Sequence, residues 1–305
     1  MPLPREGRQD DGGQPNFGEL ADLSPRDSPA LQRRRLGFKI RQLREAAGLD
    51  IEQVARHLYC SSSKISRIET GQVSATVRDI RDIIDFCDVS DEQRDSLLEL
   101  AHEARQRAWW HGFSGLSTTK AYISYEVAAS LIRTFEAMVV PGLLQVEEYA
   151  RTVISDMLPK PDHAEVERRL QLRMARQYLL REENAPPEFQ VVLDEAVLRR
   201  MVGSPQIMRK QLEFLVEAST SPNVTLQIFP FSAGSHIGMS GEFTILHFPN
   251  PDDSDMVYLE HTAGDLYLHN VEAVERHELM FTNLQAMALG HQESISLIRR
   301  TIMEL

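Results

Sequence analysis

Between residues 31 and 104, apolar residues recur at helical spacing in five short runs separated by turn and capping residues. In the first run, one face of the expected helix holds Leu36, Ile40, Leu43 and Ala47. Gly48 follows where a helix can end in the left-handed conformation. Asp50 and Ser61 precede the next two runs and can cap them. The pattern predicts a compact domain of five short helices over residues 31–108.

Charge is divided unevenly along the chain. The formal net charge of the 305 residues is -12. The segment from Leu31 to Arg81 contains 11 Lys and Arg but only 5 Asp and Glu, a local charge of +6. Residues 82–305 carry -15. Because charge acts locally, the basic segment remains a candidate for binding nucleic acid although the whole chain is acidic.

The second and third expected helices are short and joined by a turn of about three residues, the geometry of a helix-turn-helix, whose second helix enters the major groove. The apolar face of this recognition helix contains Ile65 and Ile68. Its polar outer face provides the candidate DNA contacts Ser62, Ser63, Lys64, Ser66, Arg67 and Thr70. Basic residues available to neutralise phosphates are Arg33, Arg34, Arg35, Lys39, Arg41, Lys64, Arg78 and Arg81.

The run from Gly48 to Gly71 resembles the XRE family of Cro and phage-repressor-like DNA-binding domains, through Gln53-Val54-Ala55, Leu58, Ser61 and Ile65-Ser66-Arg67-Ile68-Glu69. The resemblance implies base contacts from Ser62, Ser63 and Arg67, and a structural ion pair between Arg44 and Glu69. Our main hypothesis is that the chain binds a palindromic operator in double-stranded DNA as a homodimer. Two positions depart from the family pattern: Ile51 replaces a phosphate-binding Gln, and Tyr59 replaces a Gly of the turn.

A wider resemblance covers nearly everything after Leu31. Trp109-Trp110, Val140-Pro141-Gly142-Leu143-Leu144 and Pro230-Phe231-Ser232-Ala233-Gly234 are similar to segments of a group of actinobacterial regulators with an XRE module and a C-terminal domain of poorly defined function. Some of these regulators are antitoxin-like and act beside a small partner protein. The resemblance therefore implies a possible partner of that kind.

The C-terminal part, residues 109–305, is expected to be α+β. Helical patterns cover Tyr125–Phe135, Glu147–Met157, Asp162–Arg181, Glu195–Met201, Pro205–Ala218, Val271–Leu289 and Ser294–Met303. Strand patterns cover Phe189–Leu193, Val224–Phe229, Glu242–Phe248, Met256–Glu260 and Asp265–His269. The fold class is thus mainly α with an α+β C-terminal domain, in which helices accompany a largely antiparallel sheet. Residues 1–30, rich in Gly, Pro and Asp, are expected to be a disordered tail.

Three patterns in the C-terminal part leave alternatives open. A glycine-dotted loop of about 12 residues from Pro230 separates two strands; with Ser235, His236 and Ser240 it could bind a ligand or partner, or be a plain connection. The Arg-rich helix with Arg168, Arg169, Arg173 and Arg176 could bind an anion, but pairing with Glu165 and Glu167 favours a solvated face. His236, His247, Glu260, His261, His269 and His277 lack the close spacing that usually starts a metal site.

No metal, cofactor or enzymatic activity is therefore expected. Cys60 and Cys87 are the only cysteines, which favours a reduced protein. No apolar run is long enough to cross a membrane. We expect a cytoplasmic, nucleoid-associated transcription regulator that binds DNA sequence-specifically and senses a ligand or partner through its C-terminal domain. The alternative is an antitoxin-like interaction protein whose DNA binding serves autoregulation.

Overall fold

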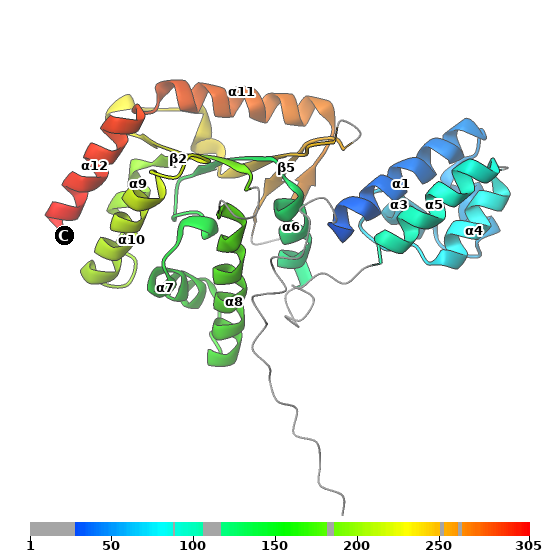
Figure 1. Cartoon of the computed structure of the whole chain (residues 1–305), viewed down its shortest axis with the longest axis horizontal. Coiled ribbons are helices and arrows are strands. Elements are labelled where there is room, and N and C mark those ends of the chain that lie inside the picture. The colour runs from blue at the N-terminus through cyan, green and yellow to red at the C-terminus, as the bar shows by residue number, and fades with distance from the viewer. Residues whose placement is uncertain (1–27, 88, 106–116, 182–185, 251–252, 262–263) are drawn as a thin grey trace, which may run out of the picture.

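The computed structural model describes residues 28–87, 89–105, 117–181, 186–250, 253–261 and 264–305. Most of the predicted tail, and the Trp109-Trp110 junction, lie outside these residues. Figure 1 shows a small bundle of helices beside a larger part that contains a sheet. The predicted fold class, mainly α with an α+β C-terminal part, is confirmed.

The predicted five short helices are present. Their bounds are α1 (Pro29–Ala46), α2 (Ile51–His57), α3 (Ser62–Glu69), α4 (Val77–Phe86) and α5 (Asp91–Glu103). Side chains of Asp50, Ser61, Thr76 and Ser90 accept hydrogen bonds from the first turns of α2 to α5. Gly48 and Gly71 follow α1 and α3 with φ of 68° and 72°, the left-handed region expected for Gly. Helix α1 begins two residues before the predicted start of this domain.

The helical bundle has its own apolar core, and Gly37 allows two of its helices, α1 and α3, to approach closely. The core includes Leu36 and Ile40 of α1, Ile65 and Ile68 of α3, and residues of α2, α4 and α5. A Cβ on Gly37 would lie 2.3 Å from the carbonyl oxygen of Ile68. Because that neighbour is backbone, α1 and α3 approach this closely only where one lacks a side chain.

Six strands form one sheet within the described part of the chain, in the order β3-β2-β1-β4-β5-β6. Their bounds are β1 (Leu131–Glu136), β2 (Glu188–Asp194), β3 (Val224–Phe229), β4 (Phe243–His247), β5 (Met256–Leu259) and β6 (Leu266–Leu268). The pairings of β1 with β4, β4 with β5 and β5 with β6 are antiparallel, whereas β1–β2 and β2–β3 are parallel. The sheet is therefore mixed, with its antiparallel pairings in the majority.

One element of the C-terminal part differs from its prediction. The segment Tyr125–Phe135, expected as a single helix, contains the end of α6 (Ser117–Ala128) and most of the central strand β1. Both of these pieces are short and apolar, so periodicity does not separate strand from helix there. Pairing decides it, because β1 is hydrogen-bonded on one side to β2 and on the other to β4.

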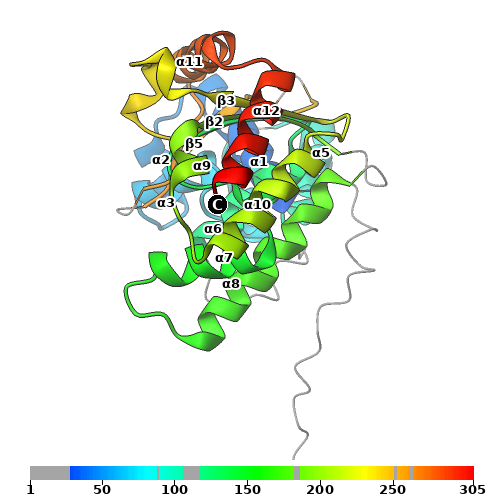
Figure 2. The same ribbon diagram turned by 90° about the vertical axis from the view of Figure 1, so that its left-hand side faces the viewer.

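Helices cover both faces of the sheet. Helix α11 (Val271–Met287) buries Met280, Phe281 and Leu284 against one face. The other face is covered by several helices, among them α7 (Glu147–Met157), α10 (Pro205–Ala218) and α12 (His291–Glu304). Helix α8 (His163–Arg176) packs against α7 through Val166 and Leu170. The short α9 (Glu195–Arg199) follows β2. Figure 2 shows α11 above the sheet and α7, α8 and α10 below it.

Helix α1 belongs to both parts of the molecule. Its first residues, Ala30 and Leu31, are buried in the core of the C-terminal part, together with Tyr125 and Ala128 of α6. The hydroxyl of Ser28 donates to the carbonyl oxygen of Ser124 in α6. Farther along, Leu36 and Ile40 enter the core of the helical bundle. A single continuous helix therefore connects the two cores.

Candidate nucleic-acid interface

Helix α3 is short and amphipathic. Its hydroxyl cap, Ser61, accepts a hydrogen bond from the backbone N–H of Lys64. Ile65 and Ile68 are buried against the bundle, while Ser62, Ser63, Ser66 and Arg67 are exposed. The exposed groups are small or long and polar, as is suitable for contact with base edges.

Some predicted DNA contacts on α3 already have partners within the chain. The ammonium group of Lys64 lies 2.8 Å from the Asp79 carboxylate in the first turn of α4. The Thr70 hydroxyl donates to the carbonyl oxygen of Ser66 at 2.9 Å, and Arg67 Nε donates to that of Ser63 at 3.2 Å. The bonds of Lys64 and Thr70 thus stabilise the two ends of α3, whereas the exposed Arg67 side chain uses only its Nε in the bond to Ser63.

Burial would raise the pKa of Asp79, but hydrogen bonds from Lys64 and Thr76 outweigh it and lower the pKa. The Asp79 carboxylate is therefore ionised at neutral pH and anchors α4 to α3.

Two of the predicted phosphate-neutralising residues, Arg41 and Arg78, remain at the surface. Arg41 pairs with Glu45 at 2.8 Å on α1, and Arg78 lies 3.8 Å from Asp82 on α4. The Arg78 side chain is 91% exposed. Exposed pairs of this kind are weak, so both arginines can turn toward a phosphate.

The cluster Arg33-Arg34-Arg35, expected to neutralise phosphates, is directed elsewhere. Arg35 donates to both carboxylate oxygens of Asp253 at 2.7 and 2.5 Å. The Arg34 guanidinium lies 5.9 Å from the ring centroid of Phe248, and burial lowers its pKa. Arg34 and Arg35 thus join α1 to the C-terminal part, whereas Arg33 Nη1 donates to the carbonyl oxygen of Ala104, directly after α5. The sequence held no local signal for this role, because Asp253 is 218 residues from Arg35.

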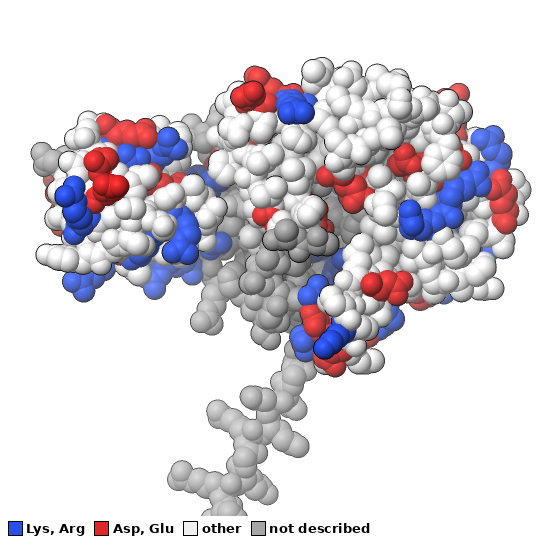
Figure 3. All heavy atoms as spheres, turned by 180° about the vertical axis from the view of Figure 1, so that it is seen from behind, with Lys and Arg blue, Asp and Glu red and all other residues white. Residues whose placement is uncertain are grey.

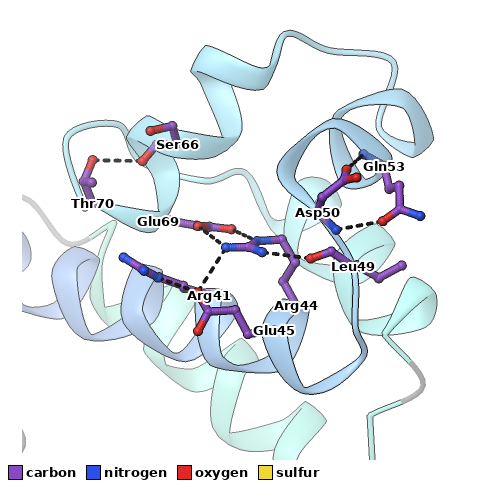
Figure 4. Close-up of polar contacts among 9 residues, drawn as sticks. All are labelled: Arg41, Arg44, Glu45, Leu49, Asp50, Gln53, Ser66, Glu69 and Thr70. Carbon is purple, nitrogen blue, oxygen red and sulfur yellow. Dashed lines mark hydrogen bonds and ion pairs between the residues drawn. The ribbon is translucent and has the colours of Figure 1, made fainter.

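Arg44 and Glu69, the two residues that the family resemblance pairs, form a bidentate ion pair between α1 and α3. Arg44 Nε donates to one carboxylate oxygen at 2.6 Å and Nη2 to the other at 3.1 Å. Nη1 donates to the carbonyl oxygen of Leu49 at 2.8 Å (Figure 4). Hydrogen bonding to Glu69 raises the pKa of Arg44. The pair is nearly buried, with side-chain exposures of 9% and 5%, so it aligns the recognition helix on α1.

The two departures from the family pattern have structural counterparts. Tyr59, in the turn before α3, has φ of 51°, a conformation that costs a non-glycine residue energy. Its side chain is almost fully exposed. Ile51, at the start of α2, packs against the apolar core of the bundle. Position 51 therefore offers no polar group to a phosphate.

The loop candidates Ser235, His236 and Ser240 do not form one exposed surface. The His236 ring is turned inward, 4.3 Å from the Phe229 ring and 5.5 Å from that of Phe135. Its Nε2 lies 3.4 Å from the carboxylate of Asp194. Ser235 and Ser240 are exposed, and the Ser240 hydroxyl donates to Ile237 within the loop. His236 thus packs against Phe135 and Phe229 of the sheet and anchors the loop there.

Family models match the chain in two places. Residues 35–97 match a helix-turn-helix domain, and residues 119–300 match a domain of unknown function, DUF5753. The second match spans more than half of the chain.

The chain belongs to the DUF5753 family. In this family member the DUF5753 domain follows a helix-turn-helix domain, which makes the chain a DNA-binding regulator. No curated protein and no solved structure matches it.

No helix among the described residues has the length and apolar character needed to cross a membrane. No three His, Cys, Asp or Glu side chains among them gather as metal ligands would.

Proposed function

We propose that the chain is a sequence-specific transcription regulator that acts through α3. In this role α3 enters the major groove, where Ser62, Ser63 and Arg67 contact base edges. Arg41 and Arg78 contact phosphates on either side. The observation that carries the proposal is the geometry of α3, which is capped by Ser61, buries Ile65 and Ile68, and presents its polar side chains to solvent.

The proposed role of the DUF5753 domain is to sense a ligand or partner and to adjust the DNA-binding domain. Support comes from α1. Its first turn lies in the core of the DUF5753 domain, and its later turns pack against α3. A movement of the first turn would therefore displace α3 as well. The proposed role is regulatory and non-catalytic.

The proposed form on DNA is a homodimer on a palindromic site. One α3 reads one half-site, and the half-sites of such operators are one helical turn apart, about 10 bp. Sedimentation of the full chain should show a dimer. Its affinity for the operator should fall with salt with a log–log slope of roughly -5 to -7, as expected for about six to eight phosphate contacts.

Selection from random double-stranded DNA tests the specificity. The full chain is incubated with the pool, and bound fragments are sequenced through several rounds. We expect enrichment of a palindrome with half-sites about 10 bp apart. A bound fraction with no enriched motif would show that binding is non-specific and would contradict the proposal.

A second candidate role, as a binding platform for a small partner protein, is favoured by apolar side chains on the loop after β3. Phe231, Ile237 and Met239 are all largely exposed there. Exposed apolar groups that lie together commonly mark protein interfaces. Co-purification of a small protein with the wild-type chain, and its loss with Met239→Ser, would support this role.

A further inference from the structure

Three carboxylates gather at one end of the sheet. Glu136 is the last residue of β1, Glu242 precedes β4, and Glu260 follows β5. They meet because β4 runs antiparallel to both β1 and β5. Glu242 is already engaged, since one of its oxygens accepts hydrogen bonds from the backbone N–H groups of Ala137 and Met138 at 2.9 and 2.6 Å. Glu136 and Glu260 are less constrained by such bonds.

Glu136 lies among polar groups on the face of the sheet opposite α11, the face to which Ile132 and Thr134 of β1 also point. Its Oε1 is 3.0 Å from the Thr134 hydroxyl, which in turn is 3.0 Å from the hydroxyl of Thr244 on β4. The side chain is half-buried. Burial, followed by the nearby charge of Glu242, raises the pKa of Glu136 well above its usual range.

Arg173 of α8 faces the same end of the sheet. Its Nη1 donates to the side-chain oxygen of Gln145 at 2.8 Å. Among the described residues, no carboxylate oxygen lies within 4.0 Å of its guanidinium. Burial lowers the pKa of Arg173 to about 10. The charges of Glu136 and Glu260 act on Arg173 from a distance, without contact.

Other arginines on α8 provide a contrast. Arg176 forms a bidentate pair with the buried Glu126 at 2.7 and 2.6 Å. Arg169 pairs with Glu165 at 2.6 Å. The two readings of the Arg-rich helix therefore apply to different residues. Arg169 belongs to a solvated face, whereas Arg173 bonds to Gln145 and has no carboxylate partner within the part of the chain that the structure describes.

Aromatic side chains lie beside these charges. The rings of Tyr122 on α6 and Tyr258 on β5 lie 4.3 Å apart. Burial raises the pKa of both phenols, so they stay protonated and can donate hydrogen bonds. Seen from behind, the larger part of the molecule has a hollowed surface with acidic side chains at its margin (Figure 3).

We propose that Glu136, Glu260 and Arg173, which we call the Glu136–Arg173 site, bind a small zwitterion such as a free amino acid. Arg173 would hold its carboxylate, while Glu260, together with Glu136 once a cation beside it favours its ionised form, would hold its ammonium group. A simple anion would be repelled by Glu260, and a simple cation by the guanidinium. A molecule that carries both charges can pair with the glutamates and with the guanidinium. Its carboxylate would give Arg173 a charged partner in place of the neutral Gln145 side chain.

The site also has a route to the DNA-binding domain. Tyr122 is on α6, and Ser124 of the same helix accepts the hydrogen bond from Ser28 beside α1. If the proposed regulatory function holds, a bound zwitterion is the signal that the DUF5753 domain senses. Binding of the zwitterion itself does not depend on that function.

Thermal unfolding of the full chain tests the site. Each of the standard amino acids is added separately at about 10 mM, and methylammonium and acetate serve as probes with one charge each. A ligand present at about a hundred times its Kd should raise Tm by roughly 5 °C. We expect at least one amino acid to do so, and the two single-charge probes to have much smaller effects. If none of the amino acids raises Tm, the proposal is wrong.

Variants locate the binding. Arg173→Met and Glu136→Gln should each abolish the shift, while Arg169→Met, which changes a paired arginine on the same helix, should retain it. Glu136→Gln is nearly isosteric and provides the test if Arg173→Met fails to fold. A shift that survives in Glu136→Gln would overturn the assignment. If an amino acid raises Tm but leaves the affinity of the chain for DNA unchanged, only the proposed regulatory function is contradicted.

Discussion

The guanidinium group of Arg35 on α1 donates hydrogen bonds to both carboxylate oxygens of Asp253, at 2.7 and 2.5 Å. Asp253 lies in the segment between β4 and β5. The Asp253 side chain is only 2% exposed. Two residues after Arg35, the bare backbone of Gly37 touches α3. The DUF5753 domain and the recognition helix thus contact the same turn of α1, which connects the two parts of the molecule.

Arg35→Ala should weaken this link. It leaves the buried Asp253 carboxylate without its partner, and we expect the free energy of unfolding to fall by about 1–3 kcal/mol. Urea denaturation followed by circular dichroism measures the change. Arg41→Ala, which removes an arginine from an exposed pair on the same helix, is the matched control and should behave like wild type. Equal midpoints for Arg35→Ala and the control would mean that the contact adds no stability.

Gly37→Ala should destabilise the helix-turn-helix domain by about 1–3 kcal/mol or more, because its methyl group would collide with the backbone of α3. Gly48→Ala makes an informative comparison, since a Cβ there meets nothing within 4 Å and only its positive φ opposes the change. Thermal melts of both variants test the close approach. A Gly37→Ala melt above that of Gly48→Ala would show that α1 and α3 are farther apart.

Glu69→Ala should cost roughly 2–3 kcal/mol, since it leaves the nearly buried Arg44 guanidinium without a carboxylate. Glu45, which touches Arg44 at 3.5 Å from an exposed position, provides the control substitution Glu45→Ala, and we expect little change from it. Chemical denaturation distinguishes the two cases. Identical unfolding curves for both variants would indicate that the Arg44–Glu69 pair is solvated in solution.

Arg67→Ala should remove specific DNA binding while leaving the fold intact. The side chain lies on the exposed face of α3, and a good base contact is worth about 1–3 kcal/mol per half-site. Gel-shift titration on the selected operator measures the loss. Arg300→Ala changes an exposed arginine on α12 and should bind like wild type. Unchanged affinity of Arg67→Ala would exclude this residue from the interface.

The stability of the DUF5753 domain should depend on pH through His247. Burial alone would lower the pKa of His247, but Asp255 and Glu278, each 2.8 Å from a ring nitrogen, raise it to about 9. Arg133 and Arg34 lie near the same carboxylates. Because the folded-state pKa is above the unfolded value near 6.5, the stabilisation is complete below pH 6.5 and is lost as pH rises through 9.

Between these pH values the free energy of unfolding should fall by about 1–2 kcal/mol, after allowance for solvent screening of a half-buried group. Urea titrations at several pH values measure this slope. In His247→Gln the slope should largely disappear. A slope of wild-type size in the variant would assign the pH dependence to other groups.

The helices of the DNA-binding domain could be predicted because their signals are local. Asp50, Ser61 and Ser90 cap helices within three residues of themselves, and Gly48 and Gly71 end helices at the positions that require positive φ. The apolar faces of α1 and α3 follow from residue spacing alone. The candidate contacts on α3 could be predicted as well, because residues opposite the apolar face of a short amphipathic helix point to solvent.

Sequence by itself thus determined the helices of the bundle, most strands and the exposed face of α3. Tertiary structure alone decided that residues 131–136 form a central strand and that Arg34 and Arg35 face the DUF5753 domain. It also decided that Arg176 pairs with Glu126, whereas Arg173 bonds to the side chain of Gln145. A helix and its caps are stabilised by hydrogen bonds between residues three or four apart. Strand pairing and the partner of a charged side chain depend instead on residues that are distant in the chain and meet only when it folds.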